Sequence, residues 1–392
     1  MMIFGKNAGG ERTVGIMTTP AEYTPPFENR GFYRRLCLLG PRLHLSVYVF
    51  TPNSVDWEQE RVTGYTYEAS AGQWVPGTFA LPAIVYDRCF FTTRRQYADY
   101  RETMGRLQRH PNVRLLGSGL KGKLDVQRLL ARDRDGRFNR YLPQTELLRS
   151  MRMLADWLRE HGEAVLKPLG GSQGRGVLHV RRNAEPGGQT PAFTLRGRDA
   201  RNREIARGFE SGAALAAFLR RLIGRRSYLL QRYLALHTRE GDAYDVRALV
   251  QKNGAGRWQL TGLAVRRGQS GSLTANLHGG GMACAAEPML AREFGRARAE
   301  AILAELRQLA DTLPEALESR HGRLAELGID FGVDTGGHIW MLEVNSKPGR
   351  SIFTYLRDDK ARLAAVANPL RYADYLLRQT AAAPARSFSL KK

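Results

Sequence analysis

The chain of 392 residues is long enough for two or three packed domains, and its 43% apolar residues and 41 glycines are typical of a soluble globular protein. It has no apolar run near eighteen residues and no apolar segment of a secretory signal before Glu11 and Arg12, so we expect a cytoplasmic protein without a transmembrane segment. The net charge of +22 predicts attraction to anionic substrates or polymers, but its spread in short groups without a recognition motif argues against a specific nucleic-acid binder.

The first ninety residues alternate short apolar runs with polar breaks. Apolar runs at 13–19, 45–52 and 81–88 are typical of strands, and residues 31–43 have the pattern of a helix. The segment "ASAGQWVPG" between them has the composition of a turn. Strand, helix and strand in this order predict an open α/β domain, which we place at residues 1–115.

Residues 94–160 are predicted to be mostly helical, with Thr145 as the N-cap of a helix. From residue 163 onward strands dominate, separated by glycine-rich breaks and by helices at 211–223 and 296–327. We expect a second domain at 116–380, of α+β character, and a flexible basic tail at 381–392. The fold class is therefore α/β, with α+β organisation in the second domain.

The stretch "VLKPLGGSQGRGV" at 165–177 combines a buried strand, Lys167 and a glycine-rich loop. Glycine costs about 0.5–1 kcal/mol in ordered structure, so a run of glycines needs an explanation. One explanation is an exposed hairpin turn. The other is a flap over residues 168–177 whose backbone amides close over phosphates, with Lys167 supplying a positive charge.

The stretch "GIDFGVDTGGHIWMLEVNS" predicts two short strands joined by a turn. Alternation places Asp330 on one face of the first strand and Glu343 with Asn345 on one face of the second. If Asp330 pairs near Glu343, three oxygen-bearing side chains converge, and such ligands suit Mg²⁺. The alternative is a polar sheet face that is exposed to solvent.

A third group of residues is basic. Arg247 lies within a strand on the same face as Asp245, Arg266 and Arg267 end another strand, and Asn276 precedes three glycines. A guanidinium at Arg247 could hold phosphate oxygens by bidentate hydrogen bonds. Taken alone, a salt bridge from Arg247 to Asp245 or Asp242 is the better explanation.

In this order the motifs resemble those of ATP-grasp enzymes. "DVRALV", "NLHGGG" and "LEVNSKPG" are similar to the branch that contains the ribosomal-protein glutamate ligases. The chain from about residue 13 to 375 most resembles the YheC/YheD-type family, ATP-grasp proteins associated with the endospore coat. "VGIMTT", "VYVFTPNSV" and "NSKPGRSIF" contribute to that closer resemblance. It implies an ATP-grasp fold that follows an N-terminal open α/β domain.

The resemblance also implies roles for individual residues. Lys123 and Lys167 match the lysines that reach the nucleotide phosphates, and either Glu240 or Asp242 would hold the ribose. The implied nucleotide-binding positions are Lys123, Lys167, Gly170, Gly171, Ser172, Gln173, Gly174 and Gly176, with Gln231, Arg232 and Tyr233 at the adenine hinge. The implied magnesium ligands are Asp330, Glu343 and Asn345, and the implied catalytic residues are Arg247, Arg266 or Arg267, and Asn276.

The implied activity is that of an ATP-dependent carboxylate–amine or carboxylate–thiol ligase that forms an acyl phosphate, with ATP and two Mg²⁺ ions. We expect an anionic or peptide-like substrate because of the net charge of +22. The alternative is a nucleotide-binding but non-catalytic protein of the spore coat or its assembly, and a third possibility is a protein that binds polyanions through charge alone.

Overall fold

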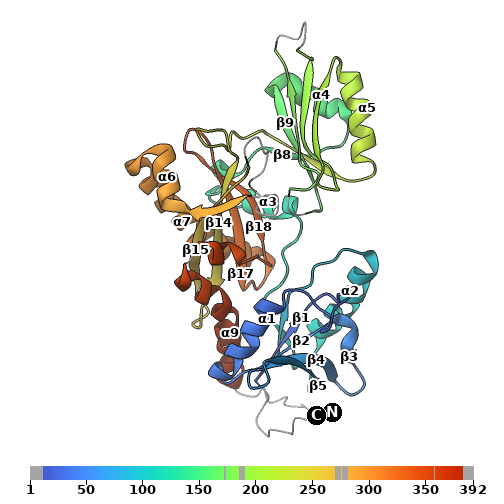
Figure 1. The fold of residues 1–392 in the computed structure, drawn as a ribbon, viewed down its shortest axis with the longest axis vertical. Helices are drawn as coiled ribbons and strands as arrows, with labels where there is room; N and C mark the ends of the chain where they lie inside the picture. Colours follow the sequence, from blue (N-terminus) through green and yellow to red (C-terminus); the bar gives the residue numbers. More distant parts are fainter. Residues whose placement is uncertain are drawn as a thin grey trace, which may run out of the picture.

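The computed structural model describes residues 12–171, 174–184, 190–269, 275, 281–356 and 358–382. In these residues three sheets follow one another along the long axis of the molecule, with helices packed beside them (Figure 1). The N-terminal sheet lies at one end, and the sheet that contains β14 (Tyr244–Lys252) and β17 (Glu326–Val333) lies in the middle. The sheet that contains β9 (Glu163–Pro168) lies at the other end. The mixed α/β fold class that the sequence predicts is confirmed.

The N-terminal sheet has parallel strands at its centre. Its order is β3-β4-β2-β1-β6-β7, and β1 pairs in parallel with β2 and with β6. Every residue of β1 is buried, as the apolar run predicts. The elements of this part are β1 (Thr13–Met17), α1 (Arg30–Leu39), η1 (Gly40–Leu43), β2 (Ser46–Phe50), η2 (Pro52–Ser54), β3 (Val55–Asp56), β4 (Arg61–Glu68), β5 (Gln73–Ala80), β6 (Ile84–Asp87), α2 (Arg94–Arg109) and β7 (Arg114–Leu115).

The segment read as a turn before β6 is mostly a strand. β5 pairs with β4 along its whole length, and only the residues before Gln73 form the turn. Pro76 obscures the strand in the sequence, but β5 pairs with β4 alone, and an edge strand tolerates a residue without an amide hydrogen. Tyr67 and Trp74, which face each other in this hairpin, pack against the N-terminal core.

The sheet at the far end is antiparallel, with the order β12-β11-β10-β9-β13-β8. Helices α4 and α5 contribute Leu158 and Leu219 to the core on one of its faces. Its elements are α3 (Lys123–Ala131), η3 (Asn139–Tyr141), β8 (Thr145–Leu147), α4 (Met151–His161), β9 (Glu163–Pro168), β10 (Leu178–Arg182), β11 (Phe193–Arg198), β12 (Glu204–Phe209), α5 (Gly212–Ile223) and β13 (Tyr228–Gln231), of which α3 and η3 precede the sheet.

Thr145 is not a helix cap. It begins strand β8 and pairs with Gln231 of β13, whereas the cap of α4 is Ser150, whose hydroxyl accepts a hydrogen bond from the Met153 amide at 3.1 Å. The helical content expected at 94–160 is therefore divided between α2, α3 and α4, with loops and a short strand between them.

The middle sheet has the order β16-β15-β14-β17-β18 and is antiparallel. Helices α6 and α7 bury one face of it, while α8 and the start of α9 pack on Leu249 and Ala264. Helix α7 ends at His321, not at 327, because Gly322 (φ +100°) follows and strand β17 begins at Glu326. The elements are β14 (Tyr244–Lys252), β15 (Trp258–Arg267), β16 (Met282–Ala285), α6 (Ala286–Phe294), α7 (Arg296–His321), β17 (Glu326–Val333), β18 (Ile339–Asn345), α8 (Ser351–Tyr355) and α9 (Asp359–Ala382).

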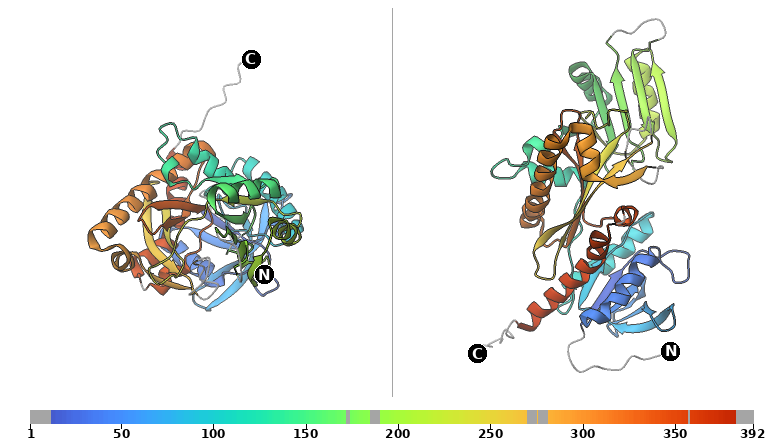
Figure 2. Two further views of the ribbon diagram at one scale, coloured as in Figure 1. Left: turned by 90° about the horizontal axis from the view of Figure 1, so that it is seen from above. Right: turned by 60° about the vertical axis from the view of Figure 1, so that its left-hand side comes forward.

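Helix α9 leaves the middle sheet and returns to the N-terminal sheet. Its residues Leu370 and Leu376 lie in the same buried cluster as Val14 and Leu36, and Figure 2 shows the helix running beside the N-terminal part of the chain. The boundary at about residue 115 remains a prediction, but α9 packs across it.

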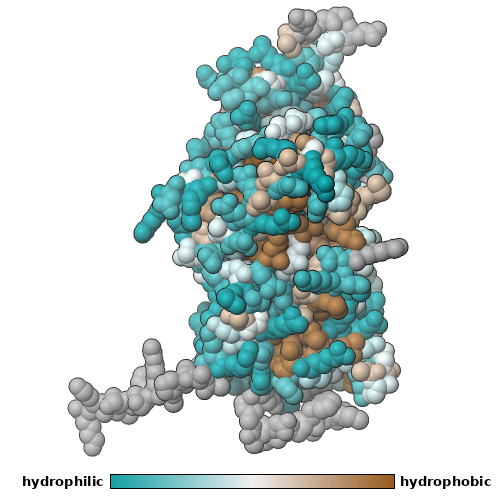
Figure 3. All heavy atoms as spheres, turned by 90° about the vertical axis from the view of Figure 1, so that its left-hand side faces the viewer, coloured by the Kyte–Doolittle hydropathy of each residue, from teal (hydrophilic) through white to brown (hydrophobic). Residues whose placement is uncertain are grey.

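Most of the face drawn in Figure 3 is hydrophilic, with hydrophobic residues gathered in bands between the polar ones. None of the helices in the described ranges combines the length and hydrophobicity that a membrane-spanning segment needs.

Candidate functional site

A cleft of about 950 Å³ lies beside the sheet that contains β9. Lys167 of β9, Gln231 of β13 and Tyr233 line it on one side, and Asp245 of β14 with Leu342 of β18 line it on the other. The volume is near the upper end of the range for small-molecule sites. The cleft therefore joins several of the predicted nucleotide-binding positions to the edge of the middle sheet.

The β17–β18 hairpin meets the condition on which the predicted metal site depends, through a shift of register between Asp330 and Phe331. Asp330 pairs with Glu343, and Asn345 pairs with Gly328 two positions along the ladder. Asp330 is buried, and Glu343 and Asn345 are half-buried. The convergence of these side chains is confirmed, and a polar face turned to solvent does not describe the buried Asp330. The role of the three residues as metal ligands stays a prediction.

Arg247 bonds to Asp330, not to the acids that the sequence suggests. Its guanidinium donates to both carboxylate oxygens of Asp330, and the Nη2–Oδ2 distance is 3.0 Å. The salt bridge to Asp245 or Asp242 was therefore the wrong pairing. The reason is strand order: β14 lies between β15 and β17, and Arg247 pairs directly with Asp330 in the ladder.

Arg266 extends this ion pair into a cluster of four charges. It donates to Asp245 at 2.6 and 2.8 Å, and its Nη2 lies 2.9 Å from Asp330 Oδ2. Burial disfavours the charged form of Asp330, but the charges of Arg247 and Arg266 outweigh it and lower the pKa of this carboxyl. Burial raises the pKa of Asp245, and Arg266 opposes that shift.

Arg267 lies apart from this cluster. Its Nε donates to Asp242 at 2.7 Å, and its Nη2 lies 3.5 Å from Glu240. Gly241 and Ala243 line the cleft next to these two acids. Of the two adjacent arginines, only Arg266 joins Arg247, and both candidate ribose ligands are already paired with Arg267.

Two lysines approach the same carboxylates. Lys123, the first residue of α3, places its Nζ 3.3 Å from Glu343 Oε2. Burial, and then the neighbouring charge of Lys123, lower the pKa of Lys167 to about 8, while Glu343 opposes the shift. Lys123 and Glu343 therefore lie close enough to affect the pKa of Lys167.

The glycine-rich segment is partly described. Gly171, Gly174 and Gly176 have φ values of +135°, +71° and +76°, which favour glycine. A Cβ at Gly176 would also lie 3.0 Å from the Tyr228 hydroxyl, so this position has no room for a side chain without a shift. Gly170 has no close neighbour. Ser172, Gln173 and Asn276 lie outside the described residues.

The hinge after β13 contributes a buried amide and an aromatic ring. Gln231 donates to Thr145 Oγ1 at 2.8 Å, and Arg232 is exposed. Tyr233 stacks on His179 with ring centroids 4.2 Å apart. His179 in turn contacts Glu163 Oε2 at 2.9 Å.

Sequence reasoning missed His179, Glu163 and Asp245 as residues of the cleft. The available signal was alternation along β10: Leu178 and Val180 face the core, so His179 between them faces the cleft.

The oxygen-bearing residues of the hairpin fit Mg²⁺ by their chemistry. Among the residues that the structure describes, no three His, Cys, Asp or Glu side chains are grouped as metal ligands, so the candidate set is two carboxylates with the Asn345 amide. Mg²⁺ typically takes only one or two carboxylates and completes its shell with water and phosphate oxygens. A carboxylate has about four lone-pair positions, and the arginines use three of those on Asp330, so one remains for a metal ion.

Comparison with known proteins identifies relatives along the whole chain. The sequence profile of the YheC/D like ATP-grasp family matches residues 112–376. The endospore coat-associated protein YheC of Bacillus subtilis (strain 168) is 27% identical over 368 residues, which cover 94% of this chain and 96% of that relative. YheD of the same organism, also named an endospore coat-associated protein, is 27% identical over 379 residues, which cover 95% and 80%. Among solved structures, the D-cycloserine synthetase DcsG superposes with a TM-score of 0.52 at 14% identity, covering 93% of this chain and 99% of that one.

Proposed function

This chain belongs to the YheC/D like ATP-grasp family, and we propose that it is an ATP-dependent ligase that joins a carboxylate to an amine or a thiol. One observation carries the proposal. Lys123, Arg247 and Arg266 contact Glu343 or Asp330, and Lys167, which lines the cleft, lies close enough to Lys123 for their charges to interact. A site with four cations around the carboxylates suits a polyphosphate with its metal ion.

In the proposed reaction a substrate carboxylate attacks the γ-phosphate of ATP and forms an acyl phosphate and ADP. The amine or thiol then displaces phosphate. Mg²⁺, held by Asp330, Glu343 and Asn345, would neutralise phosphate charge. Such chemistry depends on positioning and charge stabilisation rather than on a protein nucleophile.

The basic residues have distinct tasks in this reaction. Lys123 and Lys167 would bind the phosphates as point charges, and Arg247 with Arg266 would hold the oxygens of the transferred group by bidentate hydrogen bonds. In the structure Arg247 and Arg266 are paired with Asp330, and Lys123 is paired with Glu343. A triphosphate can replace the carboxylates as the partner of these cations, and a metal ion can replace the cations as the partner of the carboxylates. The charges therefore stay balanced when the ligands bind.

The glycines at 170, 171, 174 and 176 would form the flap over the triphosphate, and Gln231 and Tyr233 would border the adenine. We propose two Mg²⁺ ions and an acidic or peptide-like substrate, the latter because the net charge of +22 exceeds what one nucleotide needs. Because both curated relatives are named endospore coat-associated proteins, we also propose that this protein associates with spores.

The second candidate function is a coat or assembly protein that binds nucleotide without turnover. The names of the two relatives favour it, since they record an association with the coat. The two functions differ in ADP release, which only the ligase produces in a substrate-dependent way.

The test measures ADP release from MgATP across a panel of amino acids, peptides and small carboxylates. We expect release above background with at least one carboxylate and amine pair. Glu343→Gln should abolish it while the protein stays folded, because the change removes one metal-binding charge and little volume. Glu318→Gln is the matched control, since Glu318 pairs with Lys252 at 2.6 Å away from the cleft. ATP binding without ADP release from any pair would favour the coat protein.

A further inference from the structure

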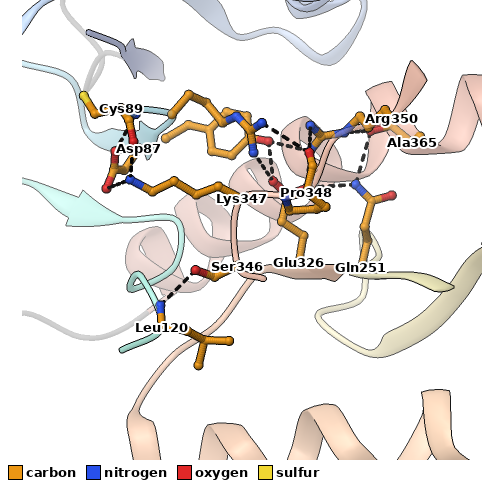
Figure 4. Close-up of polar contacts among 12 residues, drawn as sticks. Asp87, Cys89, Leu120, Gln251, Glu326, Ser346, Lys347, Pro348, Arg350 and Ala365 are labelled. Atoms are coloured by element: carbon orange, nitrogen blue, oxygen red, sulfur yellow. Dashed lines mark hydrogen bonds and ion pairs between the residues drawn. The ribbon is translucent and has the colours of Figure 1, made fainter. Parts of the chain in front are cut away.

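A second buried polar network joins the end of β6 to the segment that follows β18 (Figure 4). At its centre Glu326 accepts hydrogen bonds from Tyr86 at 2.6 Å, Arg88 at 3.1 Å and Gln251 at 3.0 Å, and it forms an ion pair with Arg350. Tyr86 lies in β6 of the N-terminal sheet, and Arg88 is the first residue after that strand. Glu326 is the first residue of β17. The N-terminal sheet is thus bonded to the strand that carries Asp330.

Lys347 makes the second connection in this network. Its ammonium lies 2.8 Å from Asp87 Oδ2 and donates to the Cys89 carbonyl at 2.9 Å. It also lies 5.3 Å from the centre of the Tyr100 ring and 5.9 Å from that of Phe91. Carboxylate, carbonyl and aromatic faces together are a specific environment for an ammonium group.

Both connections reach the candidate metal site through very short stretches of chain. Lys347 follows Asn345 by two residues, and between them the Ser346 hydroxyl accepts a hydrogen bond from the Leu120 amide at 2.8 Å. Leu120 precedes Lys123 by three residues. The segments that carry Asn345 and Lys123 therefore meet next to the Lys347 anchor.

We propose that Lys347 is a positioning residue: its bond to Asp87 fixes the segment after β18, so that Asn345 and Lys123 are held where the metal ion and the phosphates bind. This inference rests on the proposed function. Groups that orient metal ligands without touching the metal commonly change metal affinity by about 10- to 100-fold when they are removed. Lys347 acts in this way, because its ion pair with Asp87 ties the segment after β18 to the N-terminal sheet.

The chain offers a matched control in Lys252. Its ammonium pairs with Glu318 at 2.6 Å and lies 5.2 Å from the ring centres of Trp258 and Tyr372. Its side chain is 11% exposed, against 18% for Lys347. Lys252→Met and Lys347→Met therefore remove equivalent interactions, one remote from the site and one beside it.

The experiment titrates Mg²⁺ into the full-length protein with a fixed concentration of a non-hydrolysable ATP analogue and follows binding by calorimetry. We expect the Mg²⁺ concentration at half-saturation to rise at least tenfold in Lys347→Met. This concentration should stay within about twofold of the wild type in Lys252→Met. Lys347→Arg keeps the charge and should therefore retain most of the wild-type affinity for Mg²⁺. Should Lys347→Met not fold, Asp87→Asn removes the same ion pair and should give the same shift.

Hydrogen exchange of the ligand-free protein gives a second readout. Amides at 343–350 should exchange faster in Lys347→Met than in the wild type and be unchanged in Lys252→Met. Equal shifts in Mg²⁺ dependence for both methionine variants, or no shift and no change in exchange for Lys347→Met, would overturn the proposal. A wild-type protein that does not bind the analogue with Mg²⁺ would instead refute the proposed function, and the exchange comparison would still test the anchor.

Discussion

Arg247 and Arg266 share the Asp330 carboxylate, whereas Arg267, the next residue, pairs with Asp242. Arg247→Ala should lower kcat strongly but change ATP affinity by less than about tenfold, or ~1.4 kcal/mol, since the group acts mainly on the transferred phosphate. Arg267→Ala should leave kcat nearly unchanged. Steady-state kinetics measures kcat for the two variants, and binding of a non-hydrolysable ATP analogue measures their affinity for the nucleotide. An equal loss of kcat in the two variants would remove the distinction between them.

We predict that Lys167 makes nucleotide binding depend on pH. Burial and Lys123 lower its pKa to about 8, from a value near 10.4 in an unfolded chain. The folded protein therefore binds fewer protons than the unfolded chain between about pH 8 and pH 10, and Lys167 lowers stability below that window and ceases to do so above it. Bound phosphates favour the charged form, so binding should take up protons near pH 8.5.

Calorimetry of the ATP analogue in two buffers of different ionisation enthalpy measures that proton uptake. We expect uptake in the wild type near pH 8.5, a smaller value near pH 7, and none from this group in Lys167→Met. Affinity for the analogue should fall as pH rises above about 8. Identical uptake in wild type and Lys167→Met would assign the proton to another group.

At the scale of elements, the glycine-rich segment between β9 and β10 should respond to nucleotide. Gly171, Gly174 and Gly176 adopt positive φ values, and glycine has no side chain to pack, which predicts low local stability. Amide exchange across residues 165–180 should slow when a MgATP analogue saturates the protein. Gly176→Ala should weaken binding, because φ is +76° and the new methyl group would crowd the Tyr228 hydroxyl. Unchanged exchange with the analogue bound would favour a plain hairpin turn.

The pairing of the strands separates what the sequence could predict from what it could not. Alternation predicted the two strands of the hairpin, but the pairing of Asp330 with Glu343 stayed a condition. It depends on a shift of register between Asp330 and Phe331, without which the register that starts at the turn would place Leu342 opposite Asp330. The partner of Arg247 could not be predicted, since it depends on β14 lying next to β17, about eighty residues later in the chain. Thr145 was misread because a threonine before an amphipathic run suits a cap as well as a strand edge, and only pairing with β13 decides between them.

At the scale of the whole molecule, the net charge of +22 should affect substrate capture. Attraction between a basic protein and an anionic substrate weakens with ionic strength. For the true substrate we therefore expect kcat/KM to fall markedly between about 0.05 and 0.5 M salt, while kcat changes little. A neutral or cationic substrate whose kcat/KM does not respond to salt would mean that the charge serves another purpose.

Helix α9 and the network around Glu326 join the N-terminal sheet to the middle sheet at two separate places. Neither could be predicted from the sequence, because each joins residues that are more than two hundred positions apart. Together they hold the end of β6 beside β17 and the segment that follows β18.

The ligase proposal is tested most directly by following oxygen during turnover. A substrate carboxylate labelled with ¹⁸O on both oxygens is incubated with the protein, MgATP and the amine, and the released phosphate is analysed by mass spectrometry. An acyl phosphate passes one carboxylate oxygen to phosphorus, so we predict one ¹⁸O in each phosphate and one in each product amide. Unlabelled phosphate from a reaction that forms the ligated product would contradict the acyl-phosphate mechanism.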